Sequence, residues 1–542
     1  MFPSASFAEA WRACDDHLVT VTPSDAQRGA AGGAHFVAVG FPPDGHSTVA
    51  RTKPLGQLSA MRMRFGPATF PLTTVFVRSL QMLSGAISLC ACTSLMLAYA
   101  GDATLASQID PLFDKLTETT PGAMVLVARD GKVLFEKGYG AASLERHEPI
   151  LPDTRFRVGS ISKEFTAAAI LKLQEQEKLH VADRLSRYFP DWPGGDAITL
   201  YHLLSHTSGI HNYTAKPGFA SNVTTGITLD ALIESFRNDA ADFPPGTKYL
   251  YGNSGYVLLA SIVAKVSGEH YEDFLRKTFF DPLGMRDTGV FPSDGALPHA
   301  ASGYAFEKGE IALAVQWHPD WLSGCGSLYS TARDLFRWNE ALFSGRVLAE
   351  ATIRQAFSVA TLALDDPTHP EETGYGMGWI IDRLRGEREV SHGGDMAGFG
   401  SYLLRLPEKR LTVVVLLNCV PQQPGLHQWN LARDITARTL ASELPAAGAP
   451  SVDLSVPIAS LEVVTGRYDM GGGLVLVVSR RERQVYMEIF GRPKTEIFPR
   501  TDRIFFVPGA GAEATFVRNA NGEVVKAILK QAGARIDAPK IP

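Results

Sequence analysis

The spacing of apolar and polar residues changes along the chain, and the changes predict a mixed α/β architecture. Apolar runs at 123–129 and 132–137 flank Asp130-Gly131, a dipeptide typical of tight β-hairpins. Helical spacing of apolar residues, or a length suited to a helix, marks the following segments: 105–116, 160–179, 228–237, 256–265 and 428–440. Two more strand-like runs, 402–406 and 411–417, stand just before the last helix. The order of strands, then helices, then strands predicts an α+β fold, in which helices group around an antiparallel sheet.

A second pattern begins after Pro445-Ala-Ala-Gly-Ala-Pro450, whose composition predicts a linker over 445–456. Short β-type runs recur at intervals of about ten residues, which is typical of small all-β domains. These runs are 474–479, 484–489, 503–507, 514–517 and 524–529. Asn521-Gly522 predicts a tight turn before the last of them. We therefore expect a small β barrel or sandwich over 457–542, after a larger domain over 101–444.

The first hundred residues have the character of a processed segment. Residues 79–101 contain no charged side chain and lead into Ala98-Tyr-Ala100, whose small residues suit cleavage before Gly101. This predicts a signal-peptide region over 61–100, and an exported protein that is periplasmic or secreted. An uncleaved membrane anchor over 79–101 is the alternative, because 23 uncharged residues can span a bilayer. Residues 1–60 precede the signal, so we interpret them as a disordered or non-native extension.

Composition limits the function classes. Hydrophobic residues make up 45% of the 542 residues and charged residues 20%, which excludes a mainly disordered chain. The net charge of −5 argues against a nucleic-acid partner and other polyanions. Five cysteines are too few for a disulfide scaffold. The only membrane contact that the sequence predicts is through the signal or anchor segment.

The first chemical motif is Ser160-Ile-Ser-Lys163. On a helix, residues i and i+3 share a face, so Lys163 can reach the Ser160 hydroxyl. A serine is a weak nucleophile unless a base takes its proton. Lys163 can be that base only if its pKa falls from about 10.4 towards neutrality, which burial can achieve. Alone, this short motif is equally typical of an ordinary helix start.

Two further motifs carry candidate site residues. In Tyr251-Gly-Asn253 the tyrosine can relay a proton, and the asparagine can orient an amide or the lysine. In His392-Gly393-Gly394 the two glycines let a substrate backbone approach a strand edge, and a backbone N–H there can serve an oxyanion hole. Each motif alone is as well explained by an ordinary loop or turn.

Taken together, the order and spacing of these three motifs resemble the serine β-lactamase and penicillin-binding-protein superfamily. The resemblance covers roughly residues 105–440 and is strongest to its class C-like hydrolases, which include esterases and D-aminopeptidases. Three further segments support it: 198–210, 243–246 and 326–334. The resemblance implies a β-lactamase-like sheet flanked by helices, and the C-terminal β domain is similar to one often appended to these hydrolases.

The resemblance also implies roles for individual residues. Ser160 would form an acyl-enzyme, with Lys163 as the base for acylation. Tyr251 would carry the proton to the leaving group, and Asn253 would position the substrate. The oxyanion hole would use the backbone N–H groups of Ser160 and Asp395. No metal or organic cofactor is implied.

The third motif departs from the penicillin-recognising pattern, because His392-Gly393-Gly394 replaces Lys-Thr-Gly. A histidine is mostly neutral at pH 7, whereas the lysine gives a fixed charge for a substrate carboxylate. We therefore expect a small ester or amide as substrate. The alternatives are a D,D-peptidase or β-lactamase acting on cell-wall peptides or β-lactams, and a catalytically silent binding protein. His206 suggests a Ser-His-Asp triad, but we interpret its Ser-His-Thr-Ser-Gly segment as a framework turn.

Overall fold

The computed structural model describes residues 105–542 except 217, 308, 361–373, 421–425, 445–454, 471–474, 490–494, 508–511, 520 and 532–533. The predicted extension at 1–60, the signal region at 61–100 and most of the linker lie outside these residues. In the described part of the chain, no helix has both the length and the apolar character needed to cross a bilayer.

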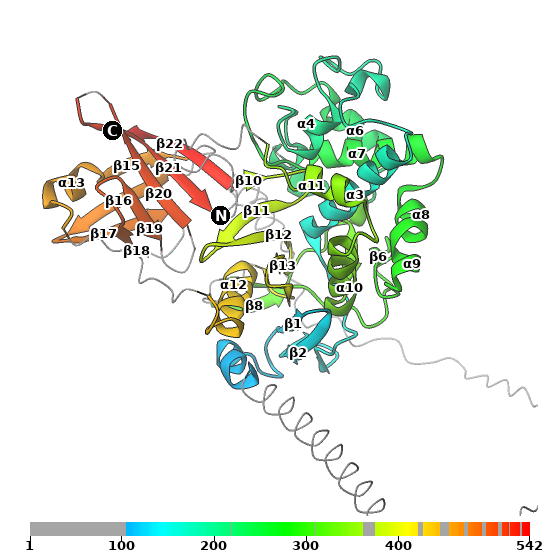
Figure 1. The fold of residues 1–542 in the computed structure, drawn as a ribbon, viewed down its shortest axis with the longest axis horizontal. Helices are drawn as coiled ribbons and strands as arrows, with labels where there is room; N and C mark the ends of the chain where they lie inside the picture. The colour runs from blue at the N-terminus through cyan, green and yellow to red at the C-terminus, as the bar shows by residue number, and fades with distance from the viewer. Residues whose placement is uncertain are drawn as a thin grey trace, which may run out of the picture. The chain divides into compact units, whose positions relative to one another are not determined.

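A seven-stranded antiparallel sheet joins the two ends of the larger domain (Figure 1). In spatial order its strands are β10 (Gly374–Tyr375), β11 (Ile380–Leu384), β12 (Glu387–Met396), β13 (Phe399–Leu406), β14 (Leu411–Leu417), β1 (Ala123–Arg129) and β2 (Lys132–Tyr139). Strand β1 pairs with β14 along its whole length, from Ala123↔Leu417 to Arg129↔Leu411. Segments almost 300 residues apart in the sequence thus lie side by side.

The hairpin between β1 and β2 forms where the sequence predicts it. Asp130 and Gly131 have φ angles of 54° and 75°, the left-handed values that a two-residue type I′ turn requires. Gly adopts such angles without strain, and Asp is among the few other residues that adopt them readily. The predicted strands at 402–406 and 411–417 are also present, as β13 and β14.

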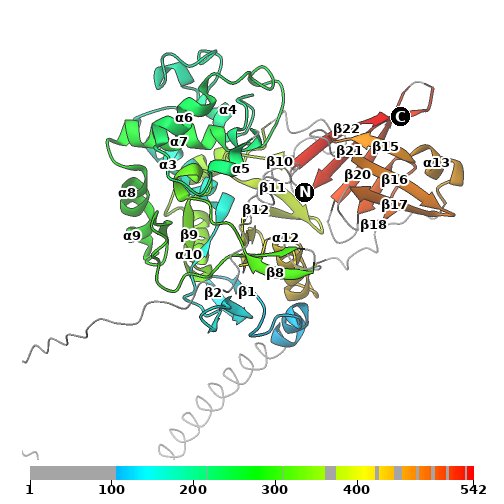
Figure 2. The same ribbon diagram turned by 180° about the vertical axis from the view of Figure 1, so that it is seen from behind.

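Helices cover both faces of this sheet, as Figures 1 and 2 show from opposite sides. Helix α12 (Gln428–Thr439) packs against β13 and β14 on one face, and α10 (Ala332–Phe343) packs against β14 and β1 on the other. The remaining helices of the larger domain are α3 (Ser162–Glu175), α4 (Leu200–Leu204), α5 (Phe219–Asn222), α6 (Leu229–Arg237), α7 (Ser254–Ser267), α8 (Tyr271–Leu275), α9 (Asp281–Leu283) and α11 (Glu350–Ala356). A π-helical turn at Arg276–Phe280 joins α8 to α9, and residues 105–109 are helical as well.

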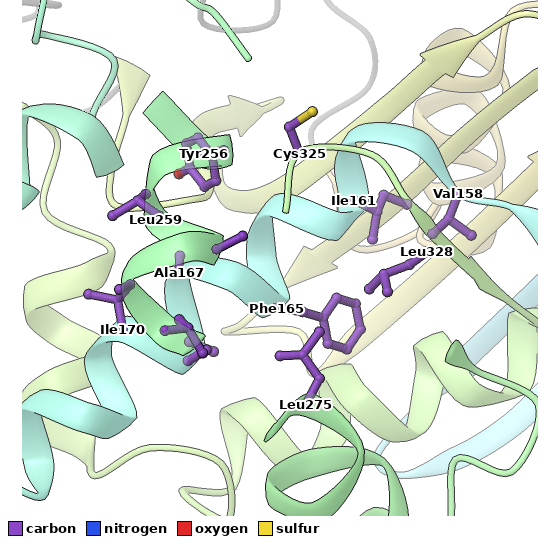
Figure 3. Close-up of a cluster of buried hydrophobic side chains, with 14 of the residues drawn as sticks. Val158, Ile161, Phe165, Ala167, Ile170, Tyr256, Leu259, Leu275, Cys325 and Leu328 are labelled. Carbon is purple, nitrogen blue, oxygen red and sulfur yellow. The ribbon is translucent and has the colours of Figure 1, made fainter. Parts of the chain in front are cut away.

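Helix α3 is the centre of the main hydrophobic core. Eleven of its 14 residues are buried, so only a narrow part of its surface faces solvent. Figure 3 shows Phe165, Ala167 and Ile170 of this helix among side chains of α7, α8 and strand β9 (Leu328–Ser330). The helix is shorter than the predicted 160–179. It ends where Glu177 adopts a left-handed φ of 56° and the Lys178 N–H turns back to the Leu173 carbonyl.

Four short strand pairs complete the larger domain's loops. Their strands are β3 (Ala141–Ser143), β4 (Glu148–Pro149), β5 (Phe156–Arg157), β6 (Gly289–Val290), β7 (Tyr304–Glu307), β8 (Glu310–Leu313) and β9. Strand β5 pairs with β9, and the Val158 N–H bonds the Leu328 carbonyl just beyond it. These bonds fix the chain immediately before Ser160.

The C-terminal region is a closed barrel of eight antiparallel strands. They are β15 (Gly466–Asp469), β16 (Val475–Arg481), β17 (Gln484–Ile489), β18 (Thr495–Pro499), β19 (Ile504–Val507), β20 (Ala512–Arg518), β21 (Val524–Gln531) and β22 (Ala534–Ile541), preceded by α13 (Ile458–Val463). The barrel, rather than the sandwich, is therefore the correct alternative. Apolar side chains such as Tyr468, Phe505 and Phe516 fill its interior. The turn at Asn521-Gly522 joins β20 to β21 as predicted.

Candidate active site

Ser160 lies on a one-turn 3₁₀ helix, Gly159–Ile161, that leads directly into α3. Lys163 therefore falls on the first turn of α3, and its amine lies 3.1 Å from the Ser160 hydroxyl. Ser160 is half-buried, whereas Lys163 is fully buried. The structure thus brings the predicted serine and lysine together, with the serine the more exposed of the two.

The Lys163 amine has two other partners, and both are carbonyl-type oxygens. Asn253 Oδ1 and the backbone oxygen of Cys325 each lie 2.9 Å from Nζ. Neither oxygen can donate a proton. When the amine is neutral, its two N–H groups can satisfy these oxygens, so that its lone pair points to the Ser160 hydroxyl. The arrangement therefore prepares Lys163 to accept the proton of Ser160.

Burial lowers the pKa of Lys163 to about 8. No carboxylate is paired with it among the ion pairs of the described residues. Its surroundings are aromatic: the amine lies 4.8 Å from the ring centre of Tyr251 and 5.6 Å from that of Tyr256. A buried cation without a counter-charge gives up its proton more easily, which is the property that a lysine base needs.

Tyr251 remains a neutral phenol in this setting. Burial raises its pKa well above the usual value, although a hydrogen bond with Ser160 acts in the opposite direction. A tyrosine that keeps its proton can donate it to Ser160 Oγ or to a leaving group. Tyr251 is thus better suited to delivering a proton than to removing one.

Asn253 connects the lysine to the loop that follows α4. Its side-chain oxygen accepts from Lys163, and its amide nitrogen donates to Thr214 Oγ1 at 3.3 Å. Its backbone N–H bonds Asn212 Oδ1 at 3.1 Å. These contacts fix its side chain beside Lys163 and the predicted nucleophile Ser160, half-exposed and able to meet a substrate amide.

Strand β12 passes close to Ser160 because glycines remove the side chains between them. A Cβ on Gly394 would lie 2.1 Å from the Val158 oxygen and 2.8 Å from the Ser160 nitrogen. Gly159, at a φ of 50°, has the Asp395 nitrogen 3.3 Å from its own missing Cβ. This packing brings together the backbone nitrogens of Ser160 and Asp395, which form the predicted oxyanion hole. Gly394 therefore permits this close packing, in addition to its predicted role of letting a substrate backbone approach the strand.

The same strand also offers a free edge. Its pairing with β11 ends at Ile380↔Ser391, whereas its pairing with β13 continues to Met396↔Phe399. From His392 onward, the described residues therefore pair with β12 on one side only. This is the type of strand edge that a substrate backbone can join.

His392 faces the site but carries neither charge nor a spare hydrogen-bonding group. Its Nδ1 lies 2.7 Å from the Gly393 oxygen, and its Nε2 lies 2.8 Å from the Tyr375 hydroxyl. Since a carbonyl only accepts, the proton is on Nδ1, and Nε2 accepts from Tyr375. Burial, with a smaller contribution from Lys163, lowers the pKa of His392 to about 3. The expected neutrality at this position is consistent with this geometry.

Tyr375 is the main site-lining residue that the motifs did not indicate. It lies in a glycine-rich run, Gly374–Gly378, and a Cβ on Gly378 would come 2.5 Å from Ala167 of α3. That spacing of glycines was a signal that this segment packs tightly against a neighbouring element, here α3. The Cys325 carbonyl was also missed, since a backbone acceptor leaves no mark on the sequence.

Metal coordination has no candidate site in the described ranges, because no three His, Cys, Asp or Glu side chains there are placed to share an ion. Cys325 and Cys419 are both buried thiols. Trp192 and Trp338 lie in the core, whereas Trp317 and Trp321 are only partly buried.

Comparison with known proteins agrees with the fold and with the family resemblance of the motifs. The beta-lactamase family model matches residues 109–437. Penicillin-binding protein 4* of Bacillus subtilis is 28% identical over 427 residues, covering 75% of this chain and 93% of that protein. The octameric penicillin-binding protein homologue from Pyrococcus abyssi is 27% identical with a TM-score of 0.56, over 80% of this chain and 99% of that one.

A D-stereospecific amidohydrolase from Streptomyces is 25% identical with a TM-score of 0.50, over 58% of this chain and 94% of that one. The family match spans more than half of the sequence and includes the Ser160, Tyr251 and His392 motifs. The chain therefore belongs to the beta-lactamase family of serine hydrolases.

Proposed function

We propose that this protein hydrolyses small esters or amides that lack a carboxylate next to the scissile bond, through an acyl-enzyme on Ser160. The observation that carries the proposal is the Lys163 amine, which contacts the Ser160 hydroxyl while its two other partners can only accept. The reaction class is then acyl transfer to water, and the substrate restriction follows from His392.

The residues would divide the reaction as follows. Lys163 takes the Ser160 proton as Oγ attacks the acyl carbon, and the N–H groups of Ser160 and Asp395 stabilise the oxyanion. The C–O or C–N bond then breaks, and Tyr251 delivers a proton to the leaving atom. Water releases the acyl group by the same route in reverse, with proton transfer through Tyr251 and Lys163. Asn253 holds the substrate amide or carbonyl.

The preference against carboxylates follows from electrostatics. His392 is neutral and both of its ring nitrogens are engaged, so this position offers no cation to an anionic substrate. A buried, unpaired carboxylate near the site would lose its hydration without compensation. Esters and amides without that group avoid this loss.

The decisive experiment compares p-nitrophenyl butyrate with a chromogenic cephalosporin, whose nucleus carries a carboxylate. We expect the full chain to hydrolyse the ester with a kcat/KM at least about 10²-fold higher, and Ser160→Ala to abolish both rates. A faster cephalosporin rate would instead support the D,D-peptidase or β-lactamase alternative, which the resemblance to penicillin-binding protein 4* favours. No Ser160-dependent rate on either substrate would support a silent binding protein.

We also propose that the enzyme is exported, because residues 79–101 are uncharged and end in a small-residue cleavage pattern. N-terminal sequencing of the protein from its natural source tests this. A first residue at Gly101 supports cleavage, and an intact segment at 79–101 supports the anchor.

A further inference from the structure

His206 is buried beside the site and has no place in the mechanism above. It follows α4 and adopts a left-handed φ of 58°, a value that is uncommon for a residue with a side chain. Only 4% of its surface is exposed. A histidine in this position and conformation calls for a physical explanation.

Two hydrogen bonds tie His206 to the residues on either side of Tyr251. Its backbone oxygen accepts from the Leu250 N–H at 3.0 Å, and its Nδ1 accepts from the Gly252 N–H at 3.3 Å. Its ring also packs on the Tyr251 ring, with 4.3 Å between centroids. One residue therefore holds the Tyr251 segment before, at and after the phenol.

The geometry also separates His206 from a triad base. Its Nδ1 lone pair is occupied by Gly252, so the ring proton is on Nε2. In the described part of the chain, Nε2 has no hydrogen-bond partner, and the contact of the Ser160 hydroxyl is with Lys163. Burial and the nearby Lys163 lower the pKa of His206 well below its usual value, which keeps the ring neutral.

We infer that His206 is a positioning residue, which holds the Tyr251 phenol at the nucleophile by clamping Leu250 and Gly252. This inference rests on the proposed function, in which Tyr251 gives a proton to the leaving group. Because kcat/KM reports acylation and not the later release of the acyl group, a misplaced phenol should lower kcat/KM chiefly for substrates whose leaving group needs a proton.

Two esters with the same acyl group reveal this difference. Ethyl butyrate must leave as an alcohol and needs the proton, whereas p-nitrophenyl butyrate leaves readily as an anion. For His206→Phe, which keeps a ring but has no acceptor for Gly252, we expect kcat/KM on ethyl butyrate to fall by about 10²-fold. On p-nitrophenyl butyrate we expect a fall of less than about fivefold. Tyr251→Phe should show the same selectivity, with a larger fall in kcat/KM on ethyl butyrate.

His206→Asn is the matched rescue variant. Its Oδ1 can replace Nδ1 as acceptor, and asparagine tolerates left-handed angles better than most residues. We expect it to retain ethyl butyrate activity within about fivefold of the wild type. Equal losses on both esters in His206→Phe, or no rescue by His206→Asn, would overturn the inference.

Hydrogen–deuterium exchange tests the clamp without any activity. The peptide containing 250–253 should exchange faster in His206→Phe and at the wild-type rate in His206→Asn. Unchanged exchange in His206→Phe would refute the clamp even if the enzyme acted on neither ester. Absence of a Ser160-dependent rate in the wild type would refute the proposed function alone, so the two failures are distinguishable.

Discussion

The two faces of strand β12 place buried ionisable groups in opposite electrostatic settings. On the face towards Ser160, His392 is neutral and the nearby Lys163 has only neutral partners. On the other face, Glu389 accepts from Arg433 at 2.8 Å, and Arg433 also bonds Asp382 at 3.0 Å. The hydroxyls of Ser391 and Tyr402 also donate hydrogen bonds to Glu389.

The pKa values of the two cations move in opposite directions. Burial lowers the pKa of Lys163 to about 8, and only a smaller contribution from the Cys325 thiol opposes this shift. Burial would also lower the pKa of Arg433, but Glu389 and Asp382 more than compensate and raise it. Paired charges therefore hold α12 against one face of the sheet, whereas Lys163, on the face towards Ser160, has no carboxylate partner among the described residues.

Lys163→Arg should produce the largest loss. Arginine keeps the positive charge but does not release its proton in a protein, so no base remains for Ser160. We expect kcat/KM on p-nitrophenyl butyrate to fall by at least about 10³-fold. Lys172→Arg, on the same helix but paired with Glu175 near the surface, is the control and should stay near wild type. An active Lys163→Arg enzyme would contradict the assignment of the base.

Gly394→Ala tests the close approach of β12 to the nucleophile. The added Cβ would meet the Val158 oxygen at 2.1 Å, so the strand and the Ser160 turn must separate. Loss of an oxyanion donor costs about 10²–10³-fold in kcat, and we expect a fall of that size. Gly326→Ala provides the comparison, because its Cβ would have no neighbour nearer than 3.6 Å. Similar rates for the two variants would show that the approach is unimportant.

The pH profile should show the ionisation of one group, Lys163, on the face of β12 towards Ser160. Because Lys163 must be neutral, kcat/KM should rise with pH through a midpoint of about 8 and fall about tenfold per unit well below it. The pKa values of His206 and His392 are lowered, so neither should add a step between pH 5 and 7. Residual activity after incubation at each pH checks that the protein remains folded. A midpoint near 6 would indicate a histidine base instead.

Local features of the fold could be predicted from the sequence, whereas long-range ones could not. The Asp130-Gly131 turn and strands β13 and β14 follow from short-range rules of conformation and periodicity. The pairing of β1 with β14 joins distant segments, and no local pattern encodes which strands will meet. Three strands of the barrel, β15, β18 and β22, were also missed, because their apolar residues are few or interrupted by polar and proline residues.

The candidate site divides in the same way. Ser160 and Lys163 could be placed together because they stand three positions apart, within one helical turn. Their contact with Asn253 depended on the resemblance, since it crosses 90 residues. Tyr375 and the Cys325 carbonyl act through tertiary packing and backbone atoms, so residue identity alone gave no indication of their contacts with His392 and Lys163.

Disrupting the ion pairs on the face of β12 away from Ser160 should have the smallest effect on the rate. It should lower the stability of the fold instead. Glu389→Gln leaves the mostly buried Arg433 with Asp382 as its one remaining charged partner among the described residues, so we expect the free energy of unfolding to fall by about 3 kcal/mol. The kcat/KM of the folded protein should change less than twofold, because Glu389 points away from Ser160. Urea unfolding and the p-nitrophenyl butyrate assay measure the two quantities on the same samples.

Glu387→Gln is the control on the same strand. Glu387 pairs with Lys409 at 3.2 Å near the surface, and such pairs contribute less than about 1 kcal/mol. If Glu389→Gln lowered kcat/KM as strongly as Gly394→Ala while both variants remained folded, the two faces would be coupled. The separation of a stabilising face from a reactive face would then be wrong, and the charge network would belong to the catalytic machinery.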